Sequence, residues 1–102
     1  MQYELETLDA FDRWFDGLSD PIGKQAIRNG LVKLSAGLFG NVEPVGSGVS
    51  EYKIDVGPGY RAYFITRQRR LIIMLCGGDK STQRADIKEA KRLAAGLGSA
   101  PA

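Results

Sequence analysis

Three short strand-like segments follow one another between residues 51 and 76, and they constrain the fold more than any other part of the chain. EYKIDV (51–56) and YRAYFIT (60–66) alternate like half-buried strands, and LIIMLC (71–76) is apolar on both faces, as a central strand is. Only GPG (57–59) and RQRR (67–70) connect them. Strands joined by such short turns pair with their neighbours. The pattern therefore predicts an antiparallel three-strand meander.

The first part of the chain predicts a strand and two helices. MQYELE (1–6) alternates like a short strand suited to a sheet edge. From Thr7, an acceptable N-cap, apolar residues follow helical spacing as far as Leu18. Asp20 and Pro21 then start a second helix, because they suit the N-cap and the first helical position. The apolar stripe of that helix is Ile27, Leu31, Leu34 and Leu38.

Glycine-rich segments divide the remainder of the chain. The stretch NVEPVGSGVS (41–50) has the composition of a surface loop. The pair Gly77 and Gly78 is expected to end the third strand of the meander. A last helix is then predicted from about Ser81 to Leu97, with its lysines and arginines largely outside.

These elements together predict an α+β fold. Their order is an N-terminal strand, a helical hairpin, an antiparallel three-strand meander and a C-terminal helix. Helices must cover the apolar side of such a sheet, so we expect all of them on one face, with the other face open. At 102 residues the chain has the size of one domain, which we place at 1–97, with a flexible tail at 98–102.

The composition, 43% hydrophobic and 25% charged, is that of an ordinary globule. The longest apolar run, 71–76, is far shorter than the roughly 20 residues of a spanning helix, and the N-terminus lacks a signal-peptide pattern. We therefore expect a cytoplasmic protein without membrane association. The single cysteine, Cys76, lies inside the apolar run and is interpreted as a small buried hydrophobe.

The chain contains no histidine. With one cysteine and no histidine, this chain alone cannot form a histidine-based triad, a Cys–His dyad or a conventional zinc site. Its carboxylates are dispersed and carry no phosphate-binding signature. We therefore expect neither a metal nor another cofactor.

Charge is polarised along the sequence although the net charge is only +2. Residues 1–20 hold six acids and one base, whereas residues 61–92 hold nine bases and three acids. A basic half of this kind is the electrostatic footprint of a nucleic-acid surface, although exposed cations are often only solvated.

Strand alternation places two cations together on the open face. If Tyr52 and Ile54 point into the core, Lys53 points outward, and the facing strand brings Arg61 beside it. Lys80 and Arg84, just past the glycine pair, are expected at the rim of the same face. Cations gathered without acidic partners repel one another, which an anionic ligand relieves. Two nearby acids, Asp55 and Asp79, are the alternative means of neutralising them.

Two motifs carry a family resemblance. The segment EYKIDVGPGYRAYF followed by LIIMLCGGDKSTQRADIKEAKRLA resembles the RelE/ParE superfamily of bacterial toxins, and most closely its HigB-like branch of addiction-module killer proteins. The upstream FDRWFDGL, GLVKL and GNVEPVGSGVSE fit the same branch, so the resemblance covers nearly the whole chain. It implies an mRNA interferase that cleaves mRNA in the ribosomal A site without a metal, inhibits translation and is neutralised by an antitoxin. ParE proteins share the fold but poison DNA gyrase.

The resemblance also implies catalytic positions. Lys53 matches the lysine of the strand before the turn, and Arg61 matches the arginine of the GYR strand. Three positions depart from the RelE pattern, because Asp55 replaces a lysine, Ser81 an arginine and Ile87 a tyrosine. The candidate catalytic residues are thus Lys53, Arg61 and Lys80, and the candidate substrate contacts are Tyr63, Arg67, Gln83 and Arg84.

Metal-free RNA cleavage needs three things: a proton removed from the 2′-OH, charge stabilised on the phosphoryl oxygens, and a leaving 5′-oxygen. Arg61 suits the second task through bidentate contacts, and, as an outward strand residue, it is expected to contribute little to the core. Lys53 acts either as a base, if crowded cations lower its pKa, or as a second electrostatic contact.

Three functions remain open from the sequence. The first is a ribosome-dependent endoribonuclease, the second a ParE-like gyrase inhibitor acting by binding, and the third a non-catalytic RNA- or antitoxin-binding protein. The partners implied are a helix-turn-helix antitoxin from the neighbouring gene, the ribosome with its mRNA, and operator DNA reached only through the antitoxin. The antitoxin is expected to cover the last helix or the helical hairpin.

Overall fold

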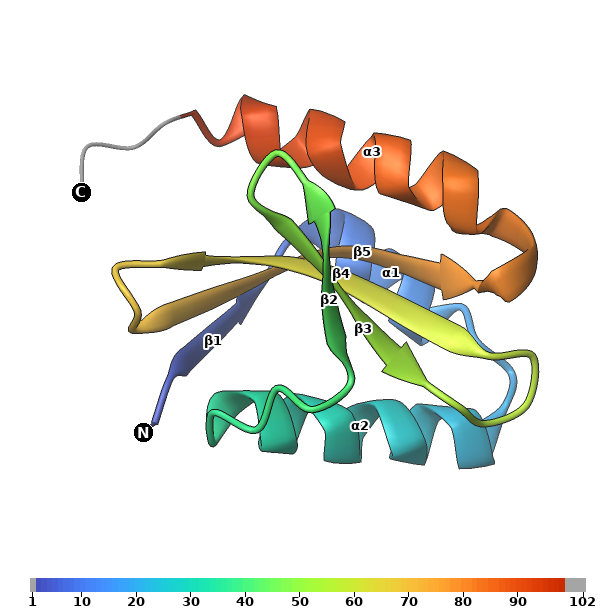
Figure 1. Cartoon of the computed structure of the whole chain (residues 1–102). Helices are drawn as coiled ribbons and strands as arrows, with labels where there is room; N and C mark the ends of the chain where they lie inside the picture. The colour runs from blue at the N-terminus through green and yellow to red at the C-terminus, as the bar shows by residue number, and fades with distance from the viewer. Residues whose placement is uncertain (1, 99–102) are drawn as a thin grey trace.

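The computed structural model describes residues 2–98. It contains five strands, three α-helices and one 3-10 turn (Figure 1). The strands are β1 (Glu4–Thr7), β2 (Val42–Gly46), β3 (Val49–Ile54), β4 (Tyr60–Arg67) and β5 (Leu71–Asp79); the helices are α1 (Asp9–Asp16), α2 (Pro21–Ser35) and α3 (Gln83–Gly96), with the 3-10 turn Lys80–Thr82 directly before α3.

The strands form one sheet in the order β1-β5-β4-β3-β2. The pairs β3–β4 and β4–β5 are antiparallel, which confirms the predicted meander. The N-terminal strand β1 lies at the sheet edge, as predicted, and pairs with β5 in parallel. Residues 99–102, which belong to the predicted tail, lie outside the described part of the chain.

The two N-terminal helices begin differently. Asp20 caps α2 by accepting a hydrogen bond from the Gly23 amide at 3.0 Å, and Pro21 is the first helical residue, as predicted. The prediction that Thr7 caps α1 is wrong, because Thr7 belongs to β1 and pairs with Met74. Leu8 occupies the N-cap of α1 without a capping side chain.

The segment predicted as a surface loop contains a strand instead. Residues Val42–Gly46 form β2, which pairs with β3 in an antiparallel hairpin. Ser47 and Gly48 both have positive φ, 58° and 77°, as the two central residues of a tight hairpin turn require. The glycines of this stretch therefore make a turn between strands, because β3 offers a free edge for pairing.

The glycine pair also fails to end β5, which continues to Asp79. A Cβ on Gly77 would collide with the Trp14 ring, and one on Gly78 with the Asp86 carboxylate. Glycine is needed at both positions because α1 and α3 approach the strand closely on its opposite faces.

Helices cover both faces of the sheet, with α3 on one side and α2 on the other (Figure 1). The α+β class is confirmed, but the prediction that all helices pack on one face is wrong. Each side has its own core. Under α2 lie Tyr52, Ile54, Tyr60, Ala62, Phe64, Ile72 and Met74, joined by Phe11 of α1. Under α3 lie Val49, Tyr63, Ile65, Ile73, Leu75 and Cys76. The physical reason is that β4 and β5 are apolar on both faces and must be buried twice.

None of the helices within residues 2–98 combines the length and the apolar character needed to cross a lipid bilayer.

Candidate functional site

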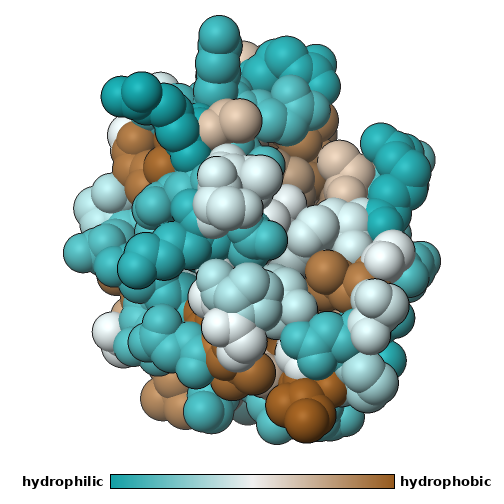
Figure 2. Space-filling view, turned by 90° about the vertical axis from the view of Figure 1, so that its right-hand side faces the viewer, coloured by the Kyte–Doolittle hydropathy of each residue, from teal (hydrophilic) through white to brown (hydrophobic). Residues whose placement is uncertain are grey.

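The candidate site lies at the end of the sheet where β3 stops, β4 starts and α3 begins. Lys53 on β3 and Arg61 on β4 are paired in the register, and Gly78 of β5 lies opposite Arg61 on its other side. Figure 2 views the molecule from this end, and the surface there is mainly hydrophilic, with only scattered apolar patches. The predicted juxtaposition of Lys53 and Arg61 is therefore present.

Arg61 is largely buried and paired with an acid. Its Nη1 donates to Oε1 of Glu51 at 3.2 Å, and the two side chains are 12% and 1% exposed. Strand alternation correctly puts both residues on the same face as Lys53, but α3 covers that part of the face. The expectation of an outward, unpaired Arg61 is wrong for this reason.

Glu51 receives two further hydrogen bonds, so that three donors converge on one buried carboxylate. The Tyr63 hydroxyl donates to its Oε2 at 3.0 Å, and the Gln83 side-chain amide donates to the same oxygen at 2.9 Å. Burial, and then the negative charge of Glu51, raises the pKa of the Tyr63 hydroxyl well above its usual range. Tyr63 therefore remains a neutral donor at physiological pH.

Lys53 is paired with a different carboxylate. Its Nζ lies 2.8 Å from Oε2 of Glu43 on β2, and the side chains are 37% and 62% exposed. The hydrogen bond from Lys53 lowers the pKa of Glu43, which is thus ionised at neutral pH. Because both members are exposed, the pair exchanges readily with solvent or with another ion.

The expected acidic neutralisers play no part in these pairs. Asp79 caps the turn after β5, where the Ser81 amide donates to its Oδ1 at 2.8 Å. The hydrogen bond from the Ser81 hydroxyl lowers the pKa of Asp79. Asp55 is exposed beyond the end of β3. Glu43 and Glu51 neutralise Lys53 and Arg61 instead. Of the predicted cluster of unpaired cations, only the residues at its rim remain unpaired among the described residues.

That rim consists of Lys80 and Arg84, both exposed. Lys80 follows the last residue of β5, and its Cβ lies 3.6 Å from where a Cβ on Gly59 would be, at the turn between β3 and β4. Neither cation belongs to a salt bridge among residues 2–98. Gln83, the first residue of α3, sits between them in the chain and turns inward to Glu51.

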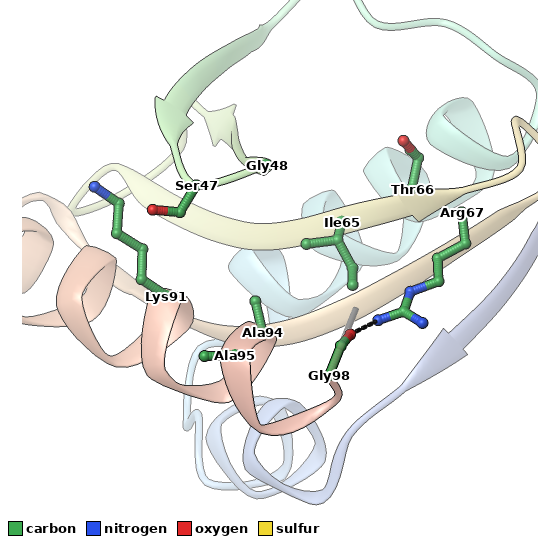
Figure 3. Close-up of a pocket in the computed structure, with 9 residues that line it drawn as sticks. All are labelled: Ser47, Gly48, Ile65, Thr66, Arg67, Lys91, Ala94, Ala95 and Gly98. Atoms are coloured by element: carbon green, nitrogen blue, oxygen red, sulfur yellow. Dashed lines mark hydrogen bonds between the residues drawn. The ribbon is translucent and has the colours of Figure 1, made fainter. Parts of the chain in front are cut away.

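Arg67, another candidate substrate contact, is not brought to this site. It ends β4, whereas Arg61 is the second residue of that strand. Its Nη2 donates to the Gly98 carbonyl at 2.9 Å, beside a pocket of about 390 Å³. In Figure 3, Lys91 of α3 and Arg67 flank this pocket from opposite sides, and Ile65 points toward Ala94 between them.

Nothing in residues 2–98 groups three histidine, cysteine, aspartate or glutamate side chains in a way that would hold a metal ion. What the end of the sheet does hold is two cations, each fixed by a glutamate. Guanidinium and ammonium groups in such an array are able to bind anions, most simply by exchange with the exposed Glu43.

Sequence reasoning missed Glu43 and Glu51 for separate reasons. Glu43 lies in the stretch 41–50, whose composition predicts a surface loop, although Val42 and Val45 in that stretch are partly buried. Glu51 shares its side of the 51–56 strand with Lys53, the side that the sequence predicts to be open. The signal that could have found it is Tyr63 and Ile65, whose apolar side chains share that face and require a cover.

Comparisons with known proteins agree with this architecture. The family model for Gp49-like phage-derived proteins matches residues 13–95. A protein of Haemophilus influenzae described only as uncharacterized is 43% identical over 98 residues, covering 96% of this chain and 99% of that protein.

Solved structures share the fold at low sequence identity. A double mutant of Escherichia coli toxin RelE in the free state superposes with a TM-score of 0.71 at 15% identity, covering 90% of this chain and 98% of that one. The RelBE2 toxin–antitoxin complex of Mycobacterium tuberculosis gives 0.63 at 15% identity, covering 78% and 100%. The chain thus has the fold of the RelE toxins and belongs to the Gp49-like family of phage-derived proteins.

Proposed function

We propose that this protein is the toxin of a type II toxin–antitoxin system and that it cleaves mRNA on the translating ribosome. Family and fold support the toxin assignment. The observation that favours a nuclease is the register pairing of Lys53 with Arg61 at an exposed end of the sheet. Two cations side by side on neighbouring strands can both contact the phosphates of an RNA backbone, whereas inhibition by binding requires no such pair.

Arg61 is the proposed contact to the cleaved phosphate. Its Nη1 is held by Glu51 and its Nε is buried, so the Nη2 edge is the part of the guanidinium left accessible. A guanidinium presented in this way stabilises the negative charge that develops on the phosphoryl oxygens when the 2′-OH attacks. Lys53 supplies the second positive charge, and Lys80 and Arg84 extend the cationic rim along the RNA.

Glu43 is the proposed proton acceptor. It is the ionised carboxylate beside Lys53, and the chain contains no histidine to serve instead. Entry of a phosphate between Lys53 and Glu43 breaks their exposed ion pair, and the freed carboxylate takes the proton of the 2′-OH. The 2′-oxygen bonds to phosphorus while the bond from phosphorus to the 5′-oxygen breaks, and the departing 5′-oxygen takes a proton from water. A carboxylate with a low pKa is a weak base, so alignment of the RNA must contribute more than proton transfer. Alignment of an intramolecular attack lowers the barrier by roughly 7–11 kcal/mol, and the ribosome is the proposed source of that alignment.

The proposed partner in the cell is an antitoxin, in our expectation a helix-turn-helix protein from the neighbouring gene through which operator DNA is reached. The M. tuberculosis neighbour was solved as a toxin–antitoxin complex. Three large apolar side chains on or just after α2 are strongly exposed: Ile22 (75%), Val32 (68%) and Leu38 (60%). Exposed apolar side chains at α2 favour a protein partner there. Hydrogen exchange of the co-purified pair should show protection at α2 or α3, and protection confined to other elements would refute this placement.

Induction of the protein without its antitoxin should arrest growth, and harmless expression of folded protein would count against the toxin assignment. The biochemical test uses translating cytoplasmic ribosomes with a defined mRNA, read by mapping new 5′ ends. A gyrase supercoiling assay runs in parallel. Cuts that appear only in translated message support the nuclease. Gyrase inhibition without cuts would assign the protein to the ParE-like class.

A further inference from the structure

Beneath Arg61 lies a carboxylate that the proposed chemistry does not itself use. Glu51 is 1% exposed, and it is the one charged residue in the buried part of residues 2–98. Burial of a carboxylate is costly unless it is paired and hydrogen-bonded. Here three donors from two elements meet it: Arg61 and Tyr63 from β4, and Gln83 from the start of α3.

Stability alone does not account for a charge at this position. The same face of β3 carries Val49, which packs fully buried under α3. A buried ion pair is on average no more stabilising than apolar side chains of similar volume. A hydrophobic residue in place of Glu51 would therefore suit the core at least as well, provided that Arg61 were replaced with it.

The hydrogen bonds of Glu51 fix the orientation of the guanidinium. Nη1 of Arg61 is held by Oε1, while Tyr63 and Gln83 both occupy Oε2 and so hold the carboxylate itself. Nε of Arg61 is buried without a hydrogen-bond partner among the described residues. A free arginine side chain samples many rotamers, but this one is held by a hydrogen bond at Nη1 and enclosed by the protein at Nε. The remaining Nη2 edge therefore points away from the core.

We propose that Glu51 is a positioning residue for the proposed cleavage, holding the Nη2 edge of Arg61 toward the RNA phosphate, with Tyr63 and Gln83 keeping its carboxylate in place. This inference rests on the proposed function. It makes Tyr63 and Gln83 supports of the site, where the sequence indicated direct substrate contacts. The opposite role is that Glu51 competes with the phosphate for Arg61, and the two roles predict opposite effects when the negative charge is removed.

The central test is Glu51→Gln, which keeps the volume but presents an amide N–H₂ to groups that are themselves donors. If Glu51 positions Arg61, kcat for cleavage of translated mRNA should fall about 100-fold, as a misplacement near 1 Å produces. The double variant Glu51→Gln/Arg61→Ala should be no slower than Arg61→Ala alone, because Glu51 acts only through Arg61. If the role of Glu51 were purely structural, the double variant would cleave more slowly than Arg61→Ala.

The control is Glu89→Gln, which makes the same charge change on an exposed pair with Arg92 and should leave cleavage unchanged.

Tyr63→Phe carries the test if Glu51→Gln does not fold. It removes one of the three donors and keeps the ion pair, so a smaller loss in kcat is expected, again absent in the Arg61→Ala background. A faster enzyme, or an unchanged one, in either variant would overturn the proposal. Faster cleavage would identify Glu51 as a competitor of the phosphate.

A second readout does not depend on cleavage. The buried Nε–H of Arg61 should give a dispersed, slowly exchanging NMR resonance in the wild type, and it should exchange with water at least tenfold faster in Tyr63→Phe or Glu51→Gln once the restraint is lost. Unchanged exchange would refute positioning, whatever the activity. If the Nε–H exchanges faster in the variants than in the wild type, but the wild type makes no cuts in mRNA, the proposed function fails while the restraint on Arg61 stands.

Discussion

Lys53 and Arg61 lie directly opposite each other on adjacent strands, and each is bonded to a different glutamate. The two pairs are not equivalent. Lys53 and Glu43 are both exposed, whereas Glu51 is buried and Arg61 nearly so. An arriving phosphate can therefore replace Glu43 as the partner of Lys53, but it must bind Arg61 at the edge that Glu51 leaves accessible. Substitutions at the two cations should differ accordingly.

Arg61→Ala should reduce mRNA cleavage by about 100- to 1000-fold, the usual effect of removing one donor to a developing oxyanion. Arg61→Lys should recover only part of the rate, because an ammonium lacks the planar two-pronged contact. The sequence suggested an intact fold, but the structure changes that expectation. Loss of Arg61 leaves Glu51 buried without its charge partner, which costs about 3–5 kcal/mol. Urea unfolding should be measured beside the cleavage rate, at a temperature where the variant is folded.

Lys53→Ala should reduce cleavage at least tenfold while lowering the free energy of unfolding by at most about 1 kcal/mol, since its ion pair is exposed. Arg67→Ala, at the far end of β4, is the matched control and should cleave at close to the wild-type rate. The losses from Arg61→Ala and Lys53→Ala should be less than additive if both residues act on one transition state. Unaltered cleavage in both alanine variants would exclude this end of the sheet as the site.

Tyr60 should make stability depend on alkaline pH. Its hydroxyl donates to Oδ2 of Asp20 at 2.7 Å, and this hydrogen bond raises the pKa of Tyr60 to about 12. A raised pKa in the folded state means that the contribution is complete below the unfolded pKa of about 10 and is lost as pH rises toward 12. The same bond lowers the pKa of Asp20, so a second loss is expected as pH falls below about 4.

The measurement is the Tm of wild type and Tyr60→Phe from pH 3 to 12. The wild type should melt a few degrees higher between pH 5 and 9, and the difference should shrink at both ends. A difference that stays constant from pH 9 to 12 would show that the Tyr60–Asp20 bond does not link α2 to β4 in solution.

Gly77→Ala should destabilise the protein by about 1–3 kcal/mol, as overpacking of a core does, because its Cβ would collide with the ring of Trp14. Gly96→Ala is the control. Gly96 is helical and has open space around its Cβ position, so the substitution should stabilise by about 0.5–1 kcal/mol. Urea midpoints measure both. Equal midpoints for the two variants would contradict the close approach of α1 to β5.

Cys76 should be unreactive in the folded protein. The residue is 5% exposed, and burial raises the pKa of its thiol to about 12. Since the thiolate is the reactive species, labelling by a disulfide reagent at pH 8 should be at least a hundredfold slower in the native protein than in urea. Rapid native labelling would show that the contact between α3 and β5 opens frequently.

Several features of this protein follow from sequence periodicity alone. The alternation of EYKIDV and YRAYFIT determines which side chains share a face, and this correctly predicted that Lys53 and Arg61 lie side by side. The start of α2 at Asp20 and Pro21 was also predictable, because capping depends on neighbouring residues only. The α+β class followed from the order of such segments, whereas the RelE/ParE resemblance rested on the motifs EYKIDVGPGYRAYF and LIIMLCGGDKSTQRADIKEAKRLA.

The tertiary structure decided what lies on each face. A strand pattern shows that Glu51, Lys53 and Arg61 point the same way, but not how far along them a helix extends. Because α3 begins at Gln83, it buries Glu51 and most of Arg61 and leaves Lys53 exposed. The strand β2, which supplies Glu43, and the continuation of β5 through Gly77 also depend on neighbours distant in sequence. Local periodicity thus determined the orientation of each side chain, and long-range packing determined its partner.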